Sequence, residues 1–198
     1  KWDNINLGAL GYVTQIATHP TNKELVYSVT DVGGIYKYNH ETGRWIQLLN
    51  SAPIKYVGVS AGRTIALDPK DDNIIYVATG NASGDNRGGI LKSTDKGETW
   101  KRLDMEACCG QINGKDVRFG GDNLIVDPND SNVLYAASMQ EGLWRSDDAG
   151  ETWRKAGRIP EAVQSLYPLF VYTDGREKTA DGKSKVLYMG FFKGGLYK

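Results

Sequence analysis

The feature that most constrains this chain is an internal repeat with a unit of about 50 residues. In three stretches a proline is followed seven residues later by a tyrosine: Pro20 and Tyr27, Pro69 and Tyr76, Pro128 and Tyr135. A glycine with an apolar pair comes next, and the following tryptophan stands eleven residues after it each time: Gly34 and Trp45, Gly89 and Trp100, Gly142 and Trp153. A fourth copy runs from Val186-Leu187-Tyr188 to Gly195-Leu196-Tyr197. Landmarks that recur at fixed spacings in three copies and a partial fourth indicate a repeat protein.

Each unit is predicted to form strands. Short β-branched and aromatic runs alternate with Asp-Pro, Asn and Gly turns, which in the second unit gives strands over 64–67, 74–77, 89–92 and 100–103. Four strands in a unit of this length are typical of a β-propeller blade. We therefore expect an all-β propeller domain over 1–198, with blades over about 12–49, 62–104, 122–157 and 165–198. Residues 161–165 are the one short helical candidate.

The repeat also bears on the length of the chain. The fourth unit stops at Tyr197-Lys198, before its last hairpin and tryptophan strand, so we expect about three and three-quarter blades. The residues around Trp2 resemble the outer strands that contain Trp45 and Trp100. Residues 1–7 are therefore a candidate ring-closing strand, either of a four-bladed ring or of a larger ring whose later blades lie outside these 198 residues.

Composition excludes several classes of function. Lys and Arg number 24, as do Asp and Glu, so charge gives no case for binding nucleic acid or an anionic membrane surface. No apolar run approaches the roughly 20 residues that cross a bilayer. The adjacent Cys108 and Cys109 form either a strained disulfide or two free thiols, and they lack the spaced partners of a zinc site. His19 and His40 lie in separate turns, so we expect neither a metal nor a cofactor.

Two nearly identical turns match the Ser-x-Asp-x-Gly-x-x-Trp motif, the Asp-box or BNR repeat of sialidases, sortilin-like receptors and several glycoside hydrolases. Their motif residues are Asp95, Gly97 and Trp100, and Asp148, Gly150 and Trp153. The aspartate of such a hairpin accepts backbone N–H groups, the glycine takes a positive φ, and the tryptophan anchors the outer strand. We therefore interpret Asp95 and Asp148 as structural residues rather than catalytic ones.

An acidic residue stands in the first unit where sister units are apolar. Asp31 lies four residues after Tyr27, and the same position holds Met139 in the third unit and Phe192 in the fourth. Two interpretations stay open: a turn-forming aspartate before Gly-Gly, or a functional carboxylate on the loop that enters an inner strand.

At these residues the chain resembles glycoside hydrolase family 74, which contains xyloglucan-active endoglucanases and reducing-end-specific cellobiohydrolases. The resemblance covers most of 1–157, and its most specific part is the segment Thr30-Asp31-Val32-Gly33-Gly34-Ile35-Tyr36. Other matching stretches are the segment that begins at 11–13 and ends at 19–21, and residues 44–49, 65–69, 89–95 and 123–128. The resemblance favours the larger ring and makes this chain a fragment.

The resemblance implies two seven-bladed propellers that face one another across a substrate cleft. It implies that Asp31 is the general base of an inverting mechanism, roughly 6.5–9.5 Å from a general acid. The acid would lie in the second propeller, outside this chain, so we do not expect hydrolysis by these residues alone. Arg118 either lines the cleft or is an ordinary exposed arginine. The aromatic rings of Tyr12, Tyr56 and Tyr167 are candidates for stacking on sugars.

The leading hypothesis is the N-terminal propeller part of a secreted hydrolase of β-1,4-glucan or xyloglucan. Its partners would be the polysaccharide and the remainder of the same protein. The alternative is a non-catalytic Asp-box propeller that binds glycan or protein, similar to sortilin-type receptors or photosystem assembly factors. A sialidase is disfavoured, because nothing in the chain identifies an arginine triad, a tyrosine nucleophile and its glutamate partner.

Overall fold

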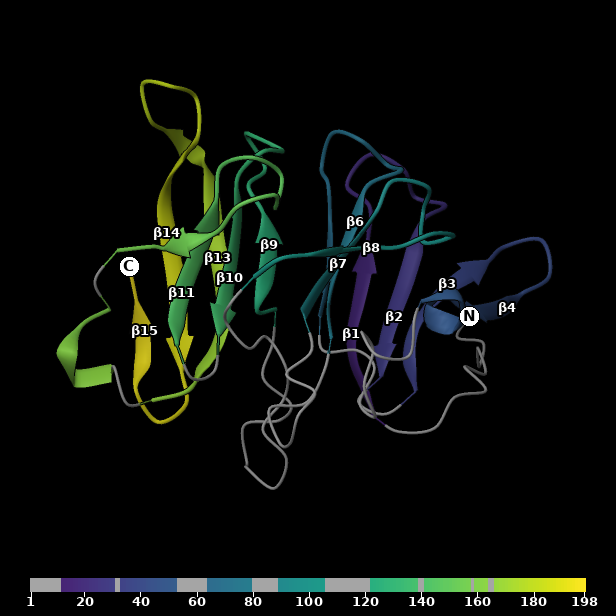
Figure 1. Ribbon diagram of the computed structural model, residues 1–198, viewed down its shortest axis with the longest axis horizontal. Coiled ribbons are helices and arrows are strands. Elements are labelled where there is room, and N and C mark those ends of the chain that lie inside the picture. The colour runs from purple at the N-terminus through teal and green to yellow at the C-terminus, as the bar shows by residue number, and fades with distance from the viewer. Residues whose placement is uncertain are drawn as a thin grey trace, which may run out of the picture.

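The computed structural model describes residues 12–30, 33–52, 64–79, 89–105, 122–138, 141–157, 159–163 and 166–198. These residues form four antiparallel sheets, and Figure 1 shows them side by side in chain order, from purple to yellow. The first sheet consists of β1 (Val13–Thr18), β2 (Val26–Thr30), β3 (Gly34–Asn39) and β4 (Arg44–Gln47). The second consists of β5 (Thr64–Leu67), β6 (Ile75–Thr79), β7 (Gly89–Ser93) and β8 (Lys101–Leu103).

The third sheet repeats this order with β9 (Leu124–Val126), β10 (Leu134–Ser138), β11 (Gly142–Ser146) and β12 (Arg154–Lys155). The fourth has three strands within the described residues, β13 (Pro168–Lys178), β14 (Ser184–Phe191) and β15 (Gly195–Tyr197). One-turn 3-10 helices occupy η1 (Leu49–Ser51) and η2 (Glu161–Val163), the latter at the predicted short helix. The predicted all-β fold of four-stranded propeller blades is confirmed. Residues 1–7 lie outside the described residues, so both ring-closing alternatives stay predictions.

The hydrophobic core lies between the sheets, because each sheet presents one face to the next. The first strands of successive blades lie beside one another in space: β1 contacts β5, β5 contacts β9 and β9 contacts β13. The tyrosine that marks the first three repeats is buried between neighbouring sheets, with Tyr27 and Tyr76 fully inaccessible and Tyr135 at 7% exposure, whereas Tyr188 of the fourth is half-buried. Burying an apolar side chain of this kind contributes about 1.5–3 kcal/mol each, so repeated packing between sheets supplies most of the stability.

The Asp-Pro landmark of the repeat forms a polar link between neighbouring sheets. Asp127 is fully buried, and its carboxylate accepts hydrogen bonds from the Ser184 backbone N–H at 3.0 Å and hydroxyl at 2.6 Å. Asp68 accepts the hydroxyl of Ser131 at 2.6 Å in the equivalent place one sheet earlier. These contacts explain why the repeat retains an aspartate before the proline.

His19 replaces that aspartate in the first unit. Its Nδ1 accepts the backbone N–H groups of Thr21 and Asn22 at 3.3 and 3.1 Å, as the carboxylate of Asp68 accepts those of Lys70 and Asp71. Because Nδ1 accepts, Nε2 carries the proton and donates to the backbone carbonyl of Asp68 at 2.8 Å. His19 is therefore a buried structural residue that ties the first sheet to the second.

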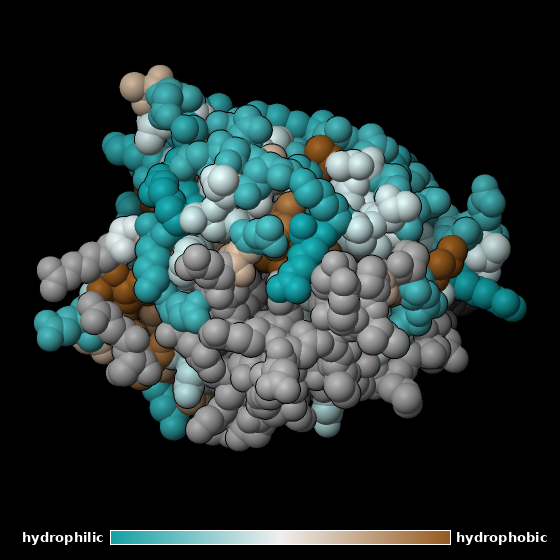
Figure 2. All heavy atoms as spheres, in the orientation of Figure 1, coloured by the Kyte–Doolittle hydropathy of each residue, from teal (hydrophilic) through white to brown (hydrophobic). Residues whose placement is uncertain are grey.

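The strand order separates two edges of the fold. In an up-and-down four-stranded blade, the turn from the second to the third strand and the connection to the next blade leave from one edge. The hairpins that join first to second and third to fourth strands leave from the other edge. We call the first the cleft edge, after the cleft that the family resemblance leads us to expect there, and the second the hairpin edge. Figure 2 shows that the described surface on the viewed face is mostly hydrophilic, with small separate hydrophobic patches.

Candidate functional site

The sequence-predicted site residues divide between described and undescribed parts of the chain. Asp31, Tyr56 and Arg118 lie outside the described residues, as do Cys108 and Cys109.

Tyr12 and Tyr167 lie directly before first strands of blades, β1 and β13, and therefore at the cleft edge. Tyr12 is 67% exposed. Tyr167 is half-buried, and its carbonyl accepts the backbone N–H of Phe192 at 2.9 Å. Because more of its side chain is exposed at this edge, Tyr12 remains the better candidate of these two for stacking on a sugar.

The described residues on either side of positions 31 and 32 are held by hydrogen bonds. The buried hydroxyl oxygen of Thr30 accepts the backbone N–H of Gly33 at 2.9 Å. The carbonyl oxygen of Gly33 accepts two side-chain donors, the hydroxyl of Tyr36 at 2.8 Å and the amide nitrogen of Gln47 at 2.6 Å. Residues 30 and 33 are thus held together by β2, β3 and β4.

The described residues of the sister blades show related hydroxyl contacts. In the second blade the hydroxyl of Thr79 donates to the carbonyl of Gly89 at 3.2 Å, and in the third the Ser138 hydroxyl accepts the Glu141 N–H at 3.3 Å. The strand register places Tyr36 opposite Gln47. At the equivalent position the second blade has Leu91 opposite Arg102, and the third has Trp144 opposite Lys155. The Tyr36–Gln47 pair is therefore particular to the blade with the extra acid. Sequence reasoning missed it, although both residues depart from the repeat.

Asp122 is a second residue that sequence reasoning missed. It lies directly before β9 at the cleft edge and borders a groove between the inner strands, alongside Gln15 and Ile65. Its backbone carbonyl accepts the Val171 N–H at 2.9 Å. Partial desolvation raises the pKa of its carboxyl, although the residue keeps an exposed surface.

The Asp-box carboxylates lie at the hairpin edge, between β7 and β8 and between β11 and β12. Asp95 accepts the Ser93 hydroxyl at 2.6 Å and the Thr99 N–H at 2.8 Å. Asp148 likewise accepts the Ser146 hydroxyl at 2.7 Å and the Thr152 N–H at 2.8 Å. Their acceptor capacity is thus used inside the hairpin, on the edge opposite Gly33.

The tryptophans of the two Asp-boxes use their indole N–H groups differently. Trp100 donates to the Leu48 carbonyl of the preceding blade at 3.3 Å, whereas Trp153 donates to Gly150 within its own turn at 2.9 Å. Trp100 therefore links two blades, and Trp153 closes its own hairpin.

The Asp-boxes should make stability depend on acid pH. Hydrogen bonds from Ser93 and Thr99 lower the pKa of Asp95 to about 2, and those from Thr152 and Ser146 lower that of Asp148 to about 2. An unfolded aspartate titrates near pH ~3.9, so the unfolded chain takes up protons first as pH falls. This stabilisation is therefore complete above about pH 5 and is lost towards about pH 2.

Urea unfolding midpoints measured across this pH range check the prediction. Asp95→Asn and Asp148→Asn should reduce the acid-dependent loss of stability. Asp104→Asn should leave it unchanged, because the exposed Asp104 side chain accepts no hydrogen bond from the described residues. An undiminished slope in the Asp95 and Asp148 variants would contradict the assignment.

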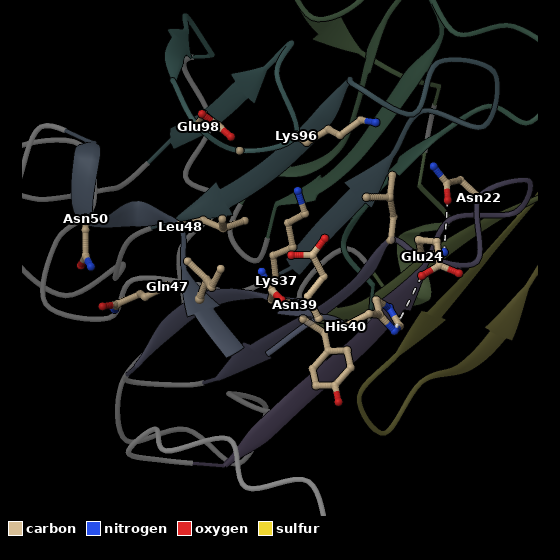
Figure 3. Close-up of a pocket in the computed structure, with 15 residues that line it drawn as sticks. Asn22, Glu24, Lys37, Asn39, His40, Gln47, Leu48, Asn50, Lys96 and Glu98 are labelled. Atoms are coloured by element: carbon tan, nitrogen blue, oxygen red, sulfur yellow. Dashed lines mark hydrogen bonds and ion pairs between the residues drawn. The ribbon is translucent and has the colours of Figure 1, made fainter. Parts of the chain in front are cut away.

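A polar groove of about 700 Å³ lies at the hairpin edge, between the β3–β4 hairpin and the first Asp-box (Figure 3). Lys37 and Lys96 project from these two segments, and His40 Nδ1 pairs with Glu24 at 3.8 Å. Tyr38 packs its ring against His40 and Trp45 with ring centroids 4.8 and 5.2 Å apart. Because the Tyr38 ring already contacts His40 and Trp45, the groove offers no clear stacking platform, and it extends along β4 to Gln47, whose amide contacts Gly33.

In the described part of the chain, no set of three or more His, Cys, Asp or Glu side chains is arranged to hold a metal ion. Likewise, none of the helices in the described ranges has the length and apolar character to span a membrane.

Comparison with known proteins places the chain among longer relatives. No protein-family model matches the sequence. The xyloglucanase Xgh74A of Acetivibrio thermocellus is 35% identical over 208 residues, covering 96% of this chain and 24% of that protein. The GH74 enzyme of Niastella koreensis aligns with a TM-score of 0.79 at 32% identity, over 95% of this chain and 27% of the other. The GH74 xyloglucanase of Xanthomonas campestris aligns at 0.77 and 28% identity, over 96% and 29%. This chain spans about a quarter of the relatives' length.

Proposed function

Since the chain is homologous to a segment of the family 74 glycoside hydrolases over nearly its whole length, we propose that it forms one wall of the substrate cleft in a longer xyloglucan hydrolase. The observation that carries the proposal is this near-complete match to proteins named xyloglucanases. The Asp-boxes alone would not carry it, because catalytic and non-catalytic propellers share that motif. The near-complete match to xyloglucanases also disfavours a non-catalytic glycan-binding or protein-binding propeller.

Asp31 is the residue that we assign as general base. Its segment stands between Thr30 and Gly33, whose backbones are fixed at the cleft edge, and no sister blade with an equivalent Met139 or Phe192 could supply a carboxylate there. The described Tyr12, exposed at the same edge, and the undescribed Tyr56 and Arg118 are the candidate substrate contacts.

In an inverting mechanism the Asp31 carboxylate removes a proton from water, whose oxygen bonds to the anomeric carbon as the glycosidic C–O bond breaks. A carboxylic acid from the remainder of the protein, in a second propeller, gives its proton to the departing oxygen. The atoms balance as addition of water across one bond, and the chemistry calls for no cofactor. Because a polysaccharide substrate lies outside cells, we place the protein in the secreted class.

The test is cleavage of xyloglucan by the full-length protein. New reducing ends, with products that first carry the inverted anomeric configuration by proton NMR, are the expected result. The 198-residue chain alone should release none. Glycan binding by the full-length protein without any new reducing ends would contradict the proposal and favour the non-catalytic alternative.

A further inference from the structure

The polar link between neighbouring sheets has a fourth member, Asp174. In every blade the link residue lies opposite the residue two positions before the repeat tyrosine: His19 and Leu25, Asp68 and Ile74, Asp127 and Val133, Asp174 and Val186. The carboxylate of Asp174 also accepts the backbone N–H of Arg176, two residues further on, at 3.1 Å. Asp127 makes the same contact with Asn129 at 2.8 Å. The sequence conceals this fourth member, because no proline follows it and the repeat tyrosine stands 14 positions after it, where the other blades have 8.

In the first three blades the link residue also bonds the following blade, but Asp174 is paired within its own hairpin. Asp127, for example, accepts the Ser184 hydroxyl of the next blade at 2.6 Å. Asp174 instead accepts the Arg176 guanidinium, with Nε–Oδ1 at 2.8 Å and Nη2–Oδ2 at 2.5 Å. The Arg176 side chain is 88% exposed, whereas that of Asp174 is 13% exposed. Because an ion pair with so exposed an arginine contributes little, a donor from another sheet can take its place.

The apolar residues near Asp174 repeat the pattern of the three interfaces between described blades. Each interface buries the repeat tyrosine and the apolar residue after the repeat glycine: Tyr27 and Ile35, Tyr76 and Ile90, Tyr135 and Leu143. The fourth blade has Tyr188 and Leu196 at these positions, the first half-buried and the second 63% exposed. With the 59% exposed Tyr172 they border a groove of about 940 Å³ that also includes Asp174 and Arg176. An exposed apolar face of this kind marks an interaction site.

We infer that this face of the fourth sheet binds a further blade of the same repeat, and that Asp174 supplies its polar link by accepting a hydroxyl or backbone N–H group of the incoming blade. A blade fits because the three interfaces between described blades use the same positions against a sheet of the same kind. Figure 1 shows the first sheet at the opposite end of the row, so we assign the face to a blade from the remainder of the longer protein. The inference rests on the proposed longer protein, but it requires none of the proposed catalytic activity.

The first test introduces Leu196→Glu into the full-length protein. A carboxylate between two blades would be desolvated without a partner, so the thermal midpoint of the propeller should fall by about 5 °C or more. Ile46→Glu is the matched control, because Ile46 is also an exposed apolar residue, at 48%, but lies in the groove at the hairpin edge. It should shift the midpoint by less than about 2 °C. An unchanged midpoint in Leu196→Glu would mean that the face stays open to solvent, and the inference would be wrong.

The same change in the 198-residue chain separates the possible occupants of the face. Leu196 stays exposed there, so Leu196→Glu should leave the midpoint unchanged. An equal loss in both proteins would indicate that the first blade closes the ring, which would overturn the inference. A dimer of the full-length protein that Leu196→Glu dissociates in analytical ultracentrifugation would overturn it as well, because it would assign the face to a second copy.

Asp174→Ala and Arg176→Ala test the polar link. In the full-length protein Asp174→Ala should lower the midpoint by about 5 °C, because donors of the incoming blade lose their acceptor. The loss should be clearly smaller in the 198-residue chain, where Asp174 serves only its own hairpin, and Arg176→Ala should cost less than about 2 °C in either protein. Equal losses for Asp174→Ala in the two proteins would contradict the link. None of these measurements involves xyloglucan, so a full-length protein that fails to cleave it would contradict the proposed function and leave this inference standing.

Discussion

Gly150→Ala is expected to destabilise the propeller by about 2–4 kcal/mol. Gly150 has φ +91°, which L side chains rarely adopt, and a Cβ built there would lie 2.5 Å from Leu103 Cδ1. Leu103 belongs to the packed core between the second and third blades, where Tyr76 also lies 3.7 Å from that position. Backbone strain and a collision with the neighbouring blade therefore add to one another.

Gly182→Ala separates these two causes. Gly182 has a similar φ of +84°, but nothing lies within 4 Å of its would-be Cβ. It should cost only the strain, about 1–2 kcal/mol. Urea and thermal unfolding of the two variants measure the difference, and equal destabilisation would contradict a packing role for the Asp-box glycine.

The fold was predictable because the repeat places residue types with strict conformational demands at fixed spacings. An Asp-box glycine of positive φ, a buried tyrosine and an Asp-Pro turn each permit few structures, and the strand order of a blade follows where they recur together. The expected strands over 64–67 and 89–92 match β5 and β7 closely. The resemblance to family 74 is likewise confirmed by relatives that cover nearly the whole chain.

The candidate site was only partly predictable. Asp31 stands out by departing from the repeat, but its role as base remains a prediction, as do the roles of Tyr12, Tyr56, Tyr167 and Arg118. The hydrogen bonds of Tyr36 and Gln47 to Gly33 join a backbone carbonyl to two side chains from different strands. Such contacts depend on strand register and side-chain direction, which spacing along one sequence does not reveal.

His19 is another residue whose structural role the sequence did not reveal. The sequence showed that it had no acid cluster for a metal site, but not that its imidazole takes the place of the aspartate in the inter-blade link. The equivalence lies in the hydrogen bonds, because Asp68 and His19 each accept the backbone N–H groups two and three residues further along the chain.

Asp31→Asn is expected to lower kcat on xyloglucan about 10²- to 10⁴-fold, the usual contribution of a general base. Asparagine keeps the size and the turn-forming ability of aspartate, so the turn between Thr30 and Gly33 should be retained. The amide cannot accept the proton of water, and the loss should therefore appear in kcat rather than in KM.

The most direct test of the account is kcat on xyloglucan for the full-length Asp31→Asn protein beside Asp148→Asn. The two variants make the same chemical change, one between Thr30 and Gly33 in the sequence and one in the Asp-box at the hairpin edge. The account predicts that turnover collapses in Asp31→Asn and stays within about 3-fold of the unmodified protein in Asp148→Asn. Unchanged turnover in Asp31→Asn, with folding intact, would contradict it.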